Sequence, residues 1–322
     1  MAGALSTYEG LLERAALDGH TWLPLSVVEA ASAEPGPGAV VPVVVDGVPG
    51  VALEEVATAE EAVADEVAGL ASEGRLAVAY GSPREDSATV ARDVHRAALP
   101  DLAQWLQAVG DDVPVVLAGD PDQLLGPAPG AVLRDVTASG LVPVLDGRPA
   151  GEGALGSVLA GLRRGELVAP DPADRGVVVV GCADDEELLH RTHQLVSTSI
   201  PRAFGLGAAD VAILAPLRRG VGGAAALGEL VPGVAATTVH EAAAGGRTWP
   251  AVVLCLPGEC AGVLSRALLV SAFVAAERHV SVVTAVGADL DAAVAHVPHR
   301  PVRRTRLAAL LRADAAEGGF GG

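Results

Sequence analysis

Apolar and polar residues recur at two spacings along this chain, and the two spacings predict different elements. Helical spacing runs through Tyr8–Ala31, with a break at Asp18-Gly19, and through the acidic stretch Glu54–Ser72. Between them, Ala39–Leu53 alternates about Asp46-Gly47, which predicts a β-hairpin. Two helices followed by a hairpin form the outline of a small winged-helix-like unit, and the same outline fits many other small domains.

From residue 75 onward, short apolar runs alternate with stretches of helical spacing. This alternation is typical of a parallel sheet whose crossover helices cover both faces. Strands are predicted within Arg75–Asp86, Asp112–Asp120, Leu141–Leu145, Arg175–Ala183, Asp210–Gly220, Val234–Gly258 (strand, loop, strand) and Leu268–Val286. Helices are predicted over Ala98–Gly110, Gly130–Gly140, Asp184–Ile200 and the Arg-rich His299–Arg312. The pattern therefore predicts the α/β class, with Asp146–Gly153 as the preferred linker and Val168–Gly176 as the second candidate.

Composition predicts an apolar core and gives no indication of a membrane-spanning segment. The chain has 322 residues, of which 50% are hydrophobic and 2% aromatic, so its core would be built from Val, Leu and Ala. No apolar run approaches the ~18 residues needed to span a bilayer, and the N-terminal sequence has no basic region followed by an apolar one. We therefore expect a cytoplasmic protein with no membrane partner.

The charged residues argue against one class of ligand and exclude one kind of catalytic group. A net charge of −18 argues against a generic nucleic-acid coat, because phosphate binding is driven by basic surface. All 22 basic residues are Arg, a bias that a GC-rich genome can also produce. Because the sequence has no Lys, a P-loop lysine, a Schiff-base lysine and a lysine general base are all excluded.

Metal and hydrolase motifs do not occur. Cys182, Cys255 and Cys260 form no CxxC pair and have no His nearby at metal-ligand spacing. Neither HExxH nor GxSxG is found, so zinc hydrolases and serine hydrolases have no support. We expect the cysteines to be buried reduced thiols, and we expect no metal site.

The stretch Val115–Val136 carries the first specific pattern. An apolar run ends in Gly119-Asp120, and Pro121-Asp122, Gln123 and a Gly/Pro turn lead into a new helical pattern. This order resembles motif III of the RecD-like helicases of superfamily 1, in which a strand leads into GDxDQL and then a helix. Ligands of open α/β sheets sit at the carboxyl ends of strands. The resemblance implies that Asp120 and Gln123 are catalytic, with Gln123 sensing the γ-phosphate and linking it to single-stranded DNA.

Four further segments resemble the same family in the same order. They are Gly147–Leu167, Asp210–Gly223 (motif IV), Thr237–Gly258 (motif V) and Leu264–Val283 (motif VI). The resemblance implies that Arg148 contributes to nucleotide binding and that Arg218 is a catalytic group. It also implies that Thr238 and His240 contact DNA, and that the chain acts in DNA repair or recombination.

The resemblance implies an organisation as well as a site. The chain is expected to contain two RecA-like, P-loop NTPase-type parallel-sheet domains, preceded by the winged-helix-like unit at residues 1–75. The first RecA-like domain, 76–147, is truncated, and the second, 148–322, resembles a UvrD-like helicase C-terminal domain. The chain is thus identified as a shortened and degenerate member of the RecD-like group.

The candidate P-loop departs from the family pattern. Gly81 and Pro83 match the family's GGPGTGKT, in which backbone amides and the lysine cradle phosphate oxygens. Arg84, Asp86 and Ser87 stand where that pattern has Gly, Gly and Lys. We expect this acidic, side-chain-filled loop to repel ATP. An equally open interpretation is that the stretch is an unrelated turn and that the P-loop is missing; both remove catalysis.

Other catalytic positions are substituted as well. The place of the acidic pair of motif II reads Arg-Asp-Val-His over Arg92–His95, so the usual Mg²⁺ ligands are lost. Ala275 stands at the arginine-finger position of motif VI, with Arg278 nearby, and Glu241 replaces the lysine of motif V. Losing several such groups should abolish turnover.

Simpler roles are open for the remaining candidates. Asp120 and Gln123 could cap the next turn, His240 could be an ordinary loop histidine, and Arg218-Arg219 could form a solvated surface pair. The basic cluster, which is more often a helix face that balances an acidic body, comprises Arg300, Arg303, Arg304, Arg306 and Arg312.

Three hypotheses follow. The preferred one is a helicase-fold protein that has lost its motor, needs no cofactor, and binds single-stranded DNA or a protein partner. The alternative is an active ATP-dependent DNA helicase that uses ATP and Mg²⁺ at a divergent site. The third is a truncated relic, or one half of a larger assembly, without a ligand.

Overall fold

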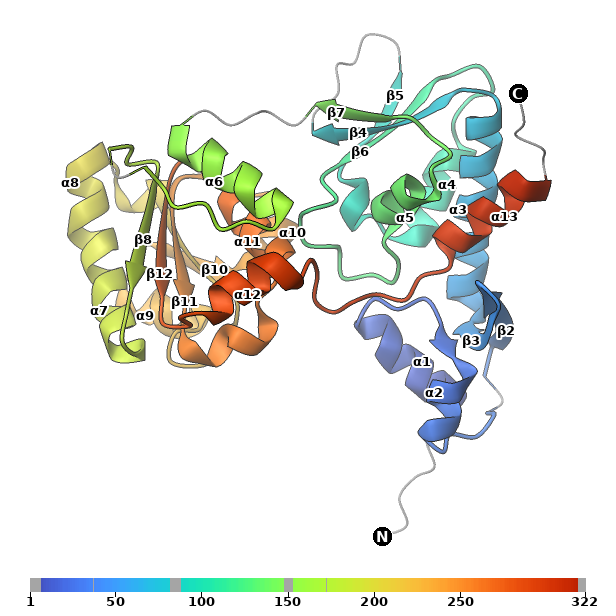
Figure 1. Ribbon diagram of the computed structural model, residues 1–322, viewed down its shortest axis with the longest axis horizontal. Helices are drawn as coiled ribbons and strands as arrows, with labels where there is room; N and C mark the ends of the chain where they lie inside the picture. The colour runs from blue at the N-terminus through green and yellow to red at the C-terminus, as the bar shows by residue number, and fades with distance from the viewer. Residues whose placement is uncertain (1–6, 37, 82–87, 148–152, 172, 318–322) are drawn as a thin grey trace. The chain divides into compact units, whose positions relative to one another are not determined.

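The structure is a computed structural model that describes residues 7–36, 38–81, 88–147, 153–171 and 173–317. Its chain divides into two compact units, drawn in Figure 1. The first unit comprises Met1–Pro121, Leu125–Arg148 and Pro301–Gly322, and the second comprises Asp122–Leu124 and Pro149–Arg300. The domain boundaries expected from the sequence, at residues 75 and 147, stay predictions.

The N-terminal part of the first unit is a small antiparallel sheet with helices. Its elements are α1 (Tyr8–Leu17), β1 (Leu23–Pro24), α2 (Leu25–Ala30), β2 (Val40–Val45) and β3 (Val48–Leu53), and the strand order is β1-β3-β2. Asp46 and Gly47 both have positive φ, 48° and 81°, as the tight turn of a two-residue hairpin requires. The predicted hairpin is therefore confirmed.

A parallel sheet forms the centre of the first unit. Its strands are β4 (Leu76–Gly81), β5 (Thr89–Ala91), β6 (Val115–Gly119) and β7 (Val144–Gly147), in the order β5-β6-β4-β7. The helices of this unit are α3 (Glu54–Ser72), α4 (Leu99–Gln107), α5 (Val132–Ser139) and α13 (Leu307–Glu317), with the short 3-10 helix η1 (Val94–Arg96). They share one apolar core with the sheet, in which Val78, Leu117 and Leu133 are fully buried.

The second unit is a larger parallel sheet in the order β10-β9-β11-β12-β8. Its strands are β8 (Val177–Gly181), β9 (Val211–Ala215), β10 (Ala235–Thr238), β11 (Trp249–Leu256) and β12 (Ala276–Thr284). Its helices are α6 (Gly153–Arg164), α7 (Asp185–Gln194), η2 (Leu195–Ser199), α8 (Ile200–Phe204), η3 (Ala208–Asp210), α9 (Ala224–Leu230), α10 (Val239–Ala244), η4 (Gly258–Val263), α11 (Arg266–Val274) and α12 (Asp289–His296). Alternate residues of β9, β11 and β12 enter two separate apolar clusters. Both faces are thus covered, and the predicted α/β class with parallel sheets is confirmed.

The two sheets differ in how completely they are covered. In the first sheet the described core lies on the face that bears the helices. Val116 on β6 is half-buried, and Leu145 on β7 is 55% exposed. The second sheet is thus covered on both faces. On the face of the first sheet opposite the helices, Ala79 and Ala118 are buried whereas Leu145 is exposed, so the cover there is uneven.

The Arg-rich helix expected over His299–Arg312 is shorter than predicted and begins at Leu307. The backbone just before it makes bonds outside any helix: Arg304 donates its N–H to His20 Nδ1 at 2.8 Å and accepts from the N–H of Thr21 at 2.8 Å. Because both main-chain groups of Arg304 are used in this way, the helical ladder cannot extend through this residue. Among the described residues, no helix is long and apolar enough to cross a membrane.

Candidate functional site

The first sheet brings three predicted motif positions to one edge. Tyr80, next to the end of β4, is paired with Gly119 at the end of β6, and β5 runs parallel to β6 on its other side. The loops after β4, β5 and β6 therefore emerge together at the carboxyl edge, where open α/β sheets bind ligands. Gly81 is the last residue of β4. The candidates Pro83 and Arg148 lie outside the described residues.

A buried histidine joins the ends of β5 and β6. His95, in η1, is 4% exposed, and its Nδ1 accepts a hydrogen bond from the main-chain N–H of Asp120 at 3.2 Å. Its proton must then lie on Nε2, which is buried and has no hydrogen-bond partner among the described residues. A side chain on Gly119 would place its Cβ 2.7 Å from Nδ1, so the close approach of η1 to β6 requires glycine there.

Electrostatics at this edge favour a neutral imidazole beside two carboxylates. Burial lowers the pKa of His95, while the charges of Asp93 and Asp120 raise it and that of Arg96 lowers it further. Asp120 is 5% exposed and follows β6 directly, whereas Asp93 has a left-handed backbone with φ of 54°. Phosphate oxygens placed at this edge would face negative charge from both strands.

Residues Asp122–Leu124, which follow shortly after Asp120, belong to the second unit. Asp122 Oδ2 lies 3.9 Å from Arg163 Nε on α6, and the N–H of Leu124 donates to Ser271 Oγ on α11 at 2.8 Å. Gln123, between these two anchored residues, is half-buried. The predicted pair Asp120 and Gln123 is therefore divided between the two units.

The second sheet brings the motif IV and motif V candidates together. Thr238 at the end of β10 is paired with Ala215 at the end of β9, so Arg218, Arg219 and His240 all follow neighbouring strand ends. All three of these side chains are exposed. The exposed guanidinium and imidazole groups can donate hydrogen bonds to a phosphate at this edge.

Glu241 contacts residues that follow or end both strands at this edge. Its carboxylate forms an ion pair with Arg218 and accepts hydrogen bonds from Thr237 Oγ1 at 2.9 Å and from the N–H of Thr238 at 3.1 Å. In return, Thr238 Oγ1 accepts from the N–H of Glu241 at 3.1 Å, which completes a capping box at the start of α10. The hydrogen bonds from Thr238 and Thr237 hold the pKa of Glu241 below its usual value. Thr238 is thus committed to ending β10 and starting a helix.

Acidic side chains also line the neighbouring loops. Asp185 Oδ1 accepts from the N–H of Gly258 at 2.9 Å, just after β11. Gly220, which follows Arg219, has a φ of 107° and lies so close to the carboxylate of Glu259 that a Cβ would collide with it. At this edge, the Glu241 carboxylate is paired with Arg218, and the Glu259 carboxylate lies beside Gly220, the residue after Arg219.

Two residues that matter here were not predicted for these roles. His95 stood out only as part of a substituted motif II, since nothing in the local sequence shows that η1 would bury it against β6. Glu241 carried a usable signal, because Thr238-Val-His-Glu241 has the spacing of a capping box. Ala275 is buried and is the C-cap residue that follows α11, and Arg278 lies exposed on β12. Within the described ranges, no group of three or more His, Cys, Asp or Glu side chains could hold a metal ion.

The sequence matches no protein-family model. Among solved structures, the chain is similar to arterivirus nonstructural protein 10, a helicase, with 15% identity, a TM-score of 0.35, and coverage of 76% of this chain and 70% of that chain. It is also similar to the complex of arterivirus nonstructural protein 10 with DNA, with 14% identity, a TM-score of 0.36, and coverage of 79% and 73%. Likeness at this level assigns no family.

Proposed function

We propose that this chain is a RecD-like helicase-fold protein that binds single-stranded DNA, in repair or recombination, and does not hydrolyse ATP. The observation that carries the proposal is the ion pair between Arg218 and Glu241 at the carboxyl edge of the second sheet. The arginine stands where the resembled motif IV has it, whereas the glutamate stands where motif V has lysine. A position that should add positive charge to a phosphate site instead neutralises its arginine.

The ion pair between Arg218 and Glu241 implies that binding of a polyanion at this edge is weak. Arg219 and His240 remain exposed beside it, so the edge keeps groups that can contact a DNA backbone. A phosphate that reaches Arg218 meets the Glu241 carboxylate beside it, which repels the phosphate and already occupies Nη1 of the guanidinium. We therefore expect DNA affinity to be low and strongly dependent on salt concentration.

The first sheet supports the loss of hydrolysis. The edge that would hold the nucleotide presents Asp93 and Asp120 around a neutral His95, and the sequence contains no lysine to bridge phosphates. Carboxylates at this edge disfavour the approach of a triphosphate. The described residues at this edge, in a chain without lysine, therefore fit ATP poorly.

The first experiment is ATP hydrolysis by the purified chain with Mg²⁺, with and without single-stranded DNA. We expect no turnover above background in either condition. A Gln123→Ala variant is the control, because this amide is the group that would link nucleotide to DNA. DNA-stimulated turnover that disappears in the variant would overturn the proposal.

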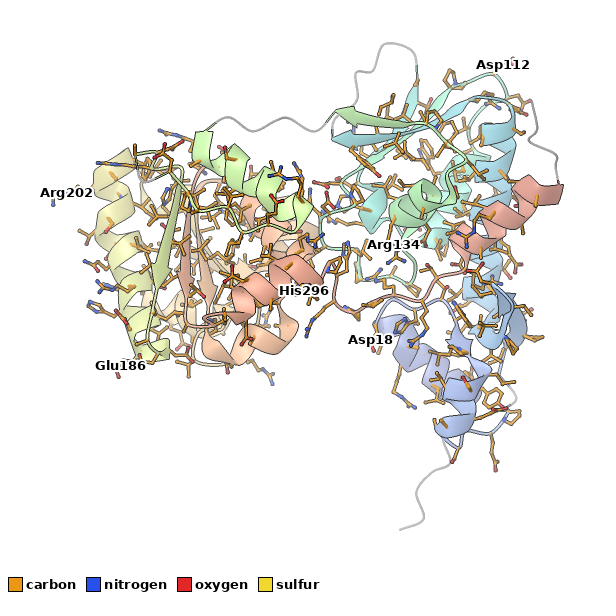
Figure 2. All side chains as sticks on the ribbon, in the orientation of Figure 1. Asp18, Asp112, Arg134, Glu186, Arg202 and His296 are labelled. Atoms are coloured by element: carbon orange, nitrogen blue, oxygen red, sulfur yellow. The ribbon has the colours of Figure 1, made fainter. Side chains whose placement is uncertain are left out.

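The second experiment measures binding of a fluorescent single-stranded oligonucleotide by anisotropy. Arg218→Ala should weaken binding, and Glu241→Gln should strengthen it, because the first removes a cation and the second releases it. Arg202→Ala is the matched control, since Arg202 is exposed on α8, away from these loops (Figure 2). Failure of all forms to bind at low salt would remove DNA as the ligand and leave a protein partner.

One observation favours the alternative of an active ATP-dependent helicase. Asp93 and Asp120 follow the neighbouring strands β5 and β6 and both act on the pKa of His95, so two carboxylates lie near the place where Mg²⁺ would be needed. If these side chains hold Mg²⁺ with ATP, Asp120→Ala should abolish turnover. The hydrolysis experiment above decides between the two proposals.

A further inference from the structure

Strand β8 forms one border of the sheet in the second unit, and its outer side is open. It pairs with β12 on one side, and no described strand lies on the other (Figure 1). Val178 is 36% exposed and Val179 is 47% exposed, which is unusual for valines of a sheet covered on both faces. Among the described residues, the border therefore presents apolar side chains and main-chain groups without a strand partner.

The main-chain groups that face outward can be identified from the pairing with β12. Val280 donates its N–H to Gly176 O, and Cys182 donates its N–H to Thr284 O, each at 2.8 Å. Because alternate residues of a strand turn their main-chain groups to the same side, the even-numbered residues of β8 face β12. Val177, Val179 and Gly181 therefore turn their N–H and C=O groups outward.

This edge lacks the devices that usually prevent pairing between molecules. Proteins protect open edges with charged residues, proline or bulges. The five residues Val177–Gly181 read Val-Val-Val-Val-Gly, and they pair with β12 without a shift of register. The edge is thus competent to accept another strand.

We propose that two copies of this chain pair through β8, antiparallel, about a two-fold axis that passes beside Val179. In this register Val179 faces Val179 of the second copy, and Val177 faces Gly181. Each of these pairs exchanges two N–H···O bonds, so all the outward groups of the strand are satisfied. A shift by one residue would set outward groups against inward ones, and the strand is therefore complementary to itself in this register.

Charge and shape around the strand fit the same pairing. In this register Arg175 faces Ala183 of the second copy and lies beside Asp184; both charged side chains are exposed. Val179 also lines an apolar cavity of about 260 Å³ between the sheet, α6 and α11. The lining includes Leu162, Leu167, Pro170, Val177, Phe273 and Val282. The two Val179 side chains would meet beside this cavity, which adds apolar contact to the main-chain bonds.

The net charge of −18 opposes association of copies through long-range repulsion. Added salt screens this repulsion, whereas it does not weaken strand pairing or apolar contact. The dimer is therefore expected to strengthen as salt concentration rises, the opposite of what DNA binding should show.

The first test is the mass of the full chain in solution, measured by sedimentation over a range of protein and salt concentrations. We expect a concentration-dependent dimer that Val179→Lys converts to a monomer. Val221→Lys is the matched control, because Val221 is 54% exposed in the loop after β9, which β11 and β12 separate from β8. A monomer at the highest soluble concentration in high salt, or a dimer unchanged by Val179→Lys, would overturn the proposal.

The second test reads the register and does not depend on a disruptive variant. In a Cys182→Ser background, Val179→Cys should form a disulfide between copies on mild oxidation, since facing residues of this kind lie about 5.5 Å apart at Cα. Val178→Cys should not, because its facing residue is Val180. Cross-linking of both variants to the same extent would show collisions rather than a defined interface, and would count against the proposal.

Discussion

His95 is buried as a neutral imidazole, which makes the free energy of unfolding depend on pH. Its pKa in the folded chain is lowered from 6.5, first by burial. As pH falls below 6.5, the unfolded chain takes up a proton that the folded chain refuses, so stability falls. We expect His95→Gln to flatten this decline in the first unit.

The measurement is urea unfolding of the first unit at several pH values, followed by fluorescence of Trp22 and Trp105 in a Trp249→Phe background. His190→Gln is the control: His190 lies on α7 of the second unit, so its loss should leave the first unit's pH dependence unchanged. An identical pH dependence in wild type and His95→Gln would show that the imidazole is not the group that titrates.

At the scale of elements, we expect the stability of helix α10 to depend on the capping box in its first turn. It has six residues, and Thr238 and Glu241 satisfy each other's main-chain donors at its start. We expect Thr238→Ala to destabilise the second unit by about 1 kcal/mol, and Thr238→Ser to restore most of the loss. Urea unfolding followed by Trp249 fluorescence measures both. If the Thr238→Ala chain is as stable as wild type, the cap does not stabilise α10, and contact with DNA is the one proposed role left for Thr238.

Elements with a strong local signal were predictable from the sequence. The hairpin about Asp46-Gly47 and the helix Glu54–Ser72 were placed at their observed positions, because a turn that needs positive φ and a long amphipathic pattern are both encoded locally. The sequence pattern does not predict strand β5, because a strand of three residues forms only through its pairing with β6. Helix α10 was expected to be a loop, because six residues are too few to show a period.

The candidate site likewise combines features that the local sequence predicts with features that depend on contacts distant in sequence. Asp120 could be placed at a strand end, because an apolar run followed by Gly-Asp-Pro predicts one. The contact between His95 and the main chain of Asp120 spans 25 residues and depends on the packing of η1, so no local pattern contains it. The pairing of Arg218 with Glu241 likewise requires β9 and β10 to be neighbours, which the sequence does not state.

At the scale of the whole molecule, the C-terminal segment returns to the first unit and is held there by arginines. Arg303 donates to the carbonyls of Ala128 at 2.9 Å and Gly130 at 2.6 Å. Arg134 on α5, labelled in Figure 2, donates to Thr305 Oγ1 at 3.1 Å. Within the basic cluster noted in the sequence, Arg300 also donates to Gly262 O and Arg312 pairs with Asp46, which leaves less of the cluster for phosphate.

The central contact of this segment is the buried ion pair between Arg306 and Glu60. Arg306 Nε lies 3.0 Å from Glu60 Oε2, and the two side chains are 5% and 0% exposed. Glu60 Oε1 also accepts from Thr21 Oγ1 and from the N–H groups of Arg306 and Leu307. Because one partner alone would leave a buried charge, Arg306→Met should destabilise the first unit by about 3–5 kcal/mol.

The control is Arg312→Ala, which removes an exposed pair with Asp46 and should cost about 0–1 kcal/mol. Urea unfolding of each variant, read from Trp22 and Trp105, gives the two losses. Adding Glu60→Met to Arg306→Met should recover part of the stability, since the uncompensated charge is gone, but not all of it, since Thr21 and two main-chain N–H groups lose their acceptor. Equal losses in the Arg306 and Arg312 variants would mean that the segment is held by its apolar contacts, Leu307 and Leu311, rather than by the ion pair.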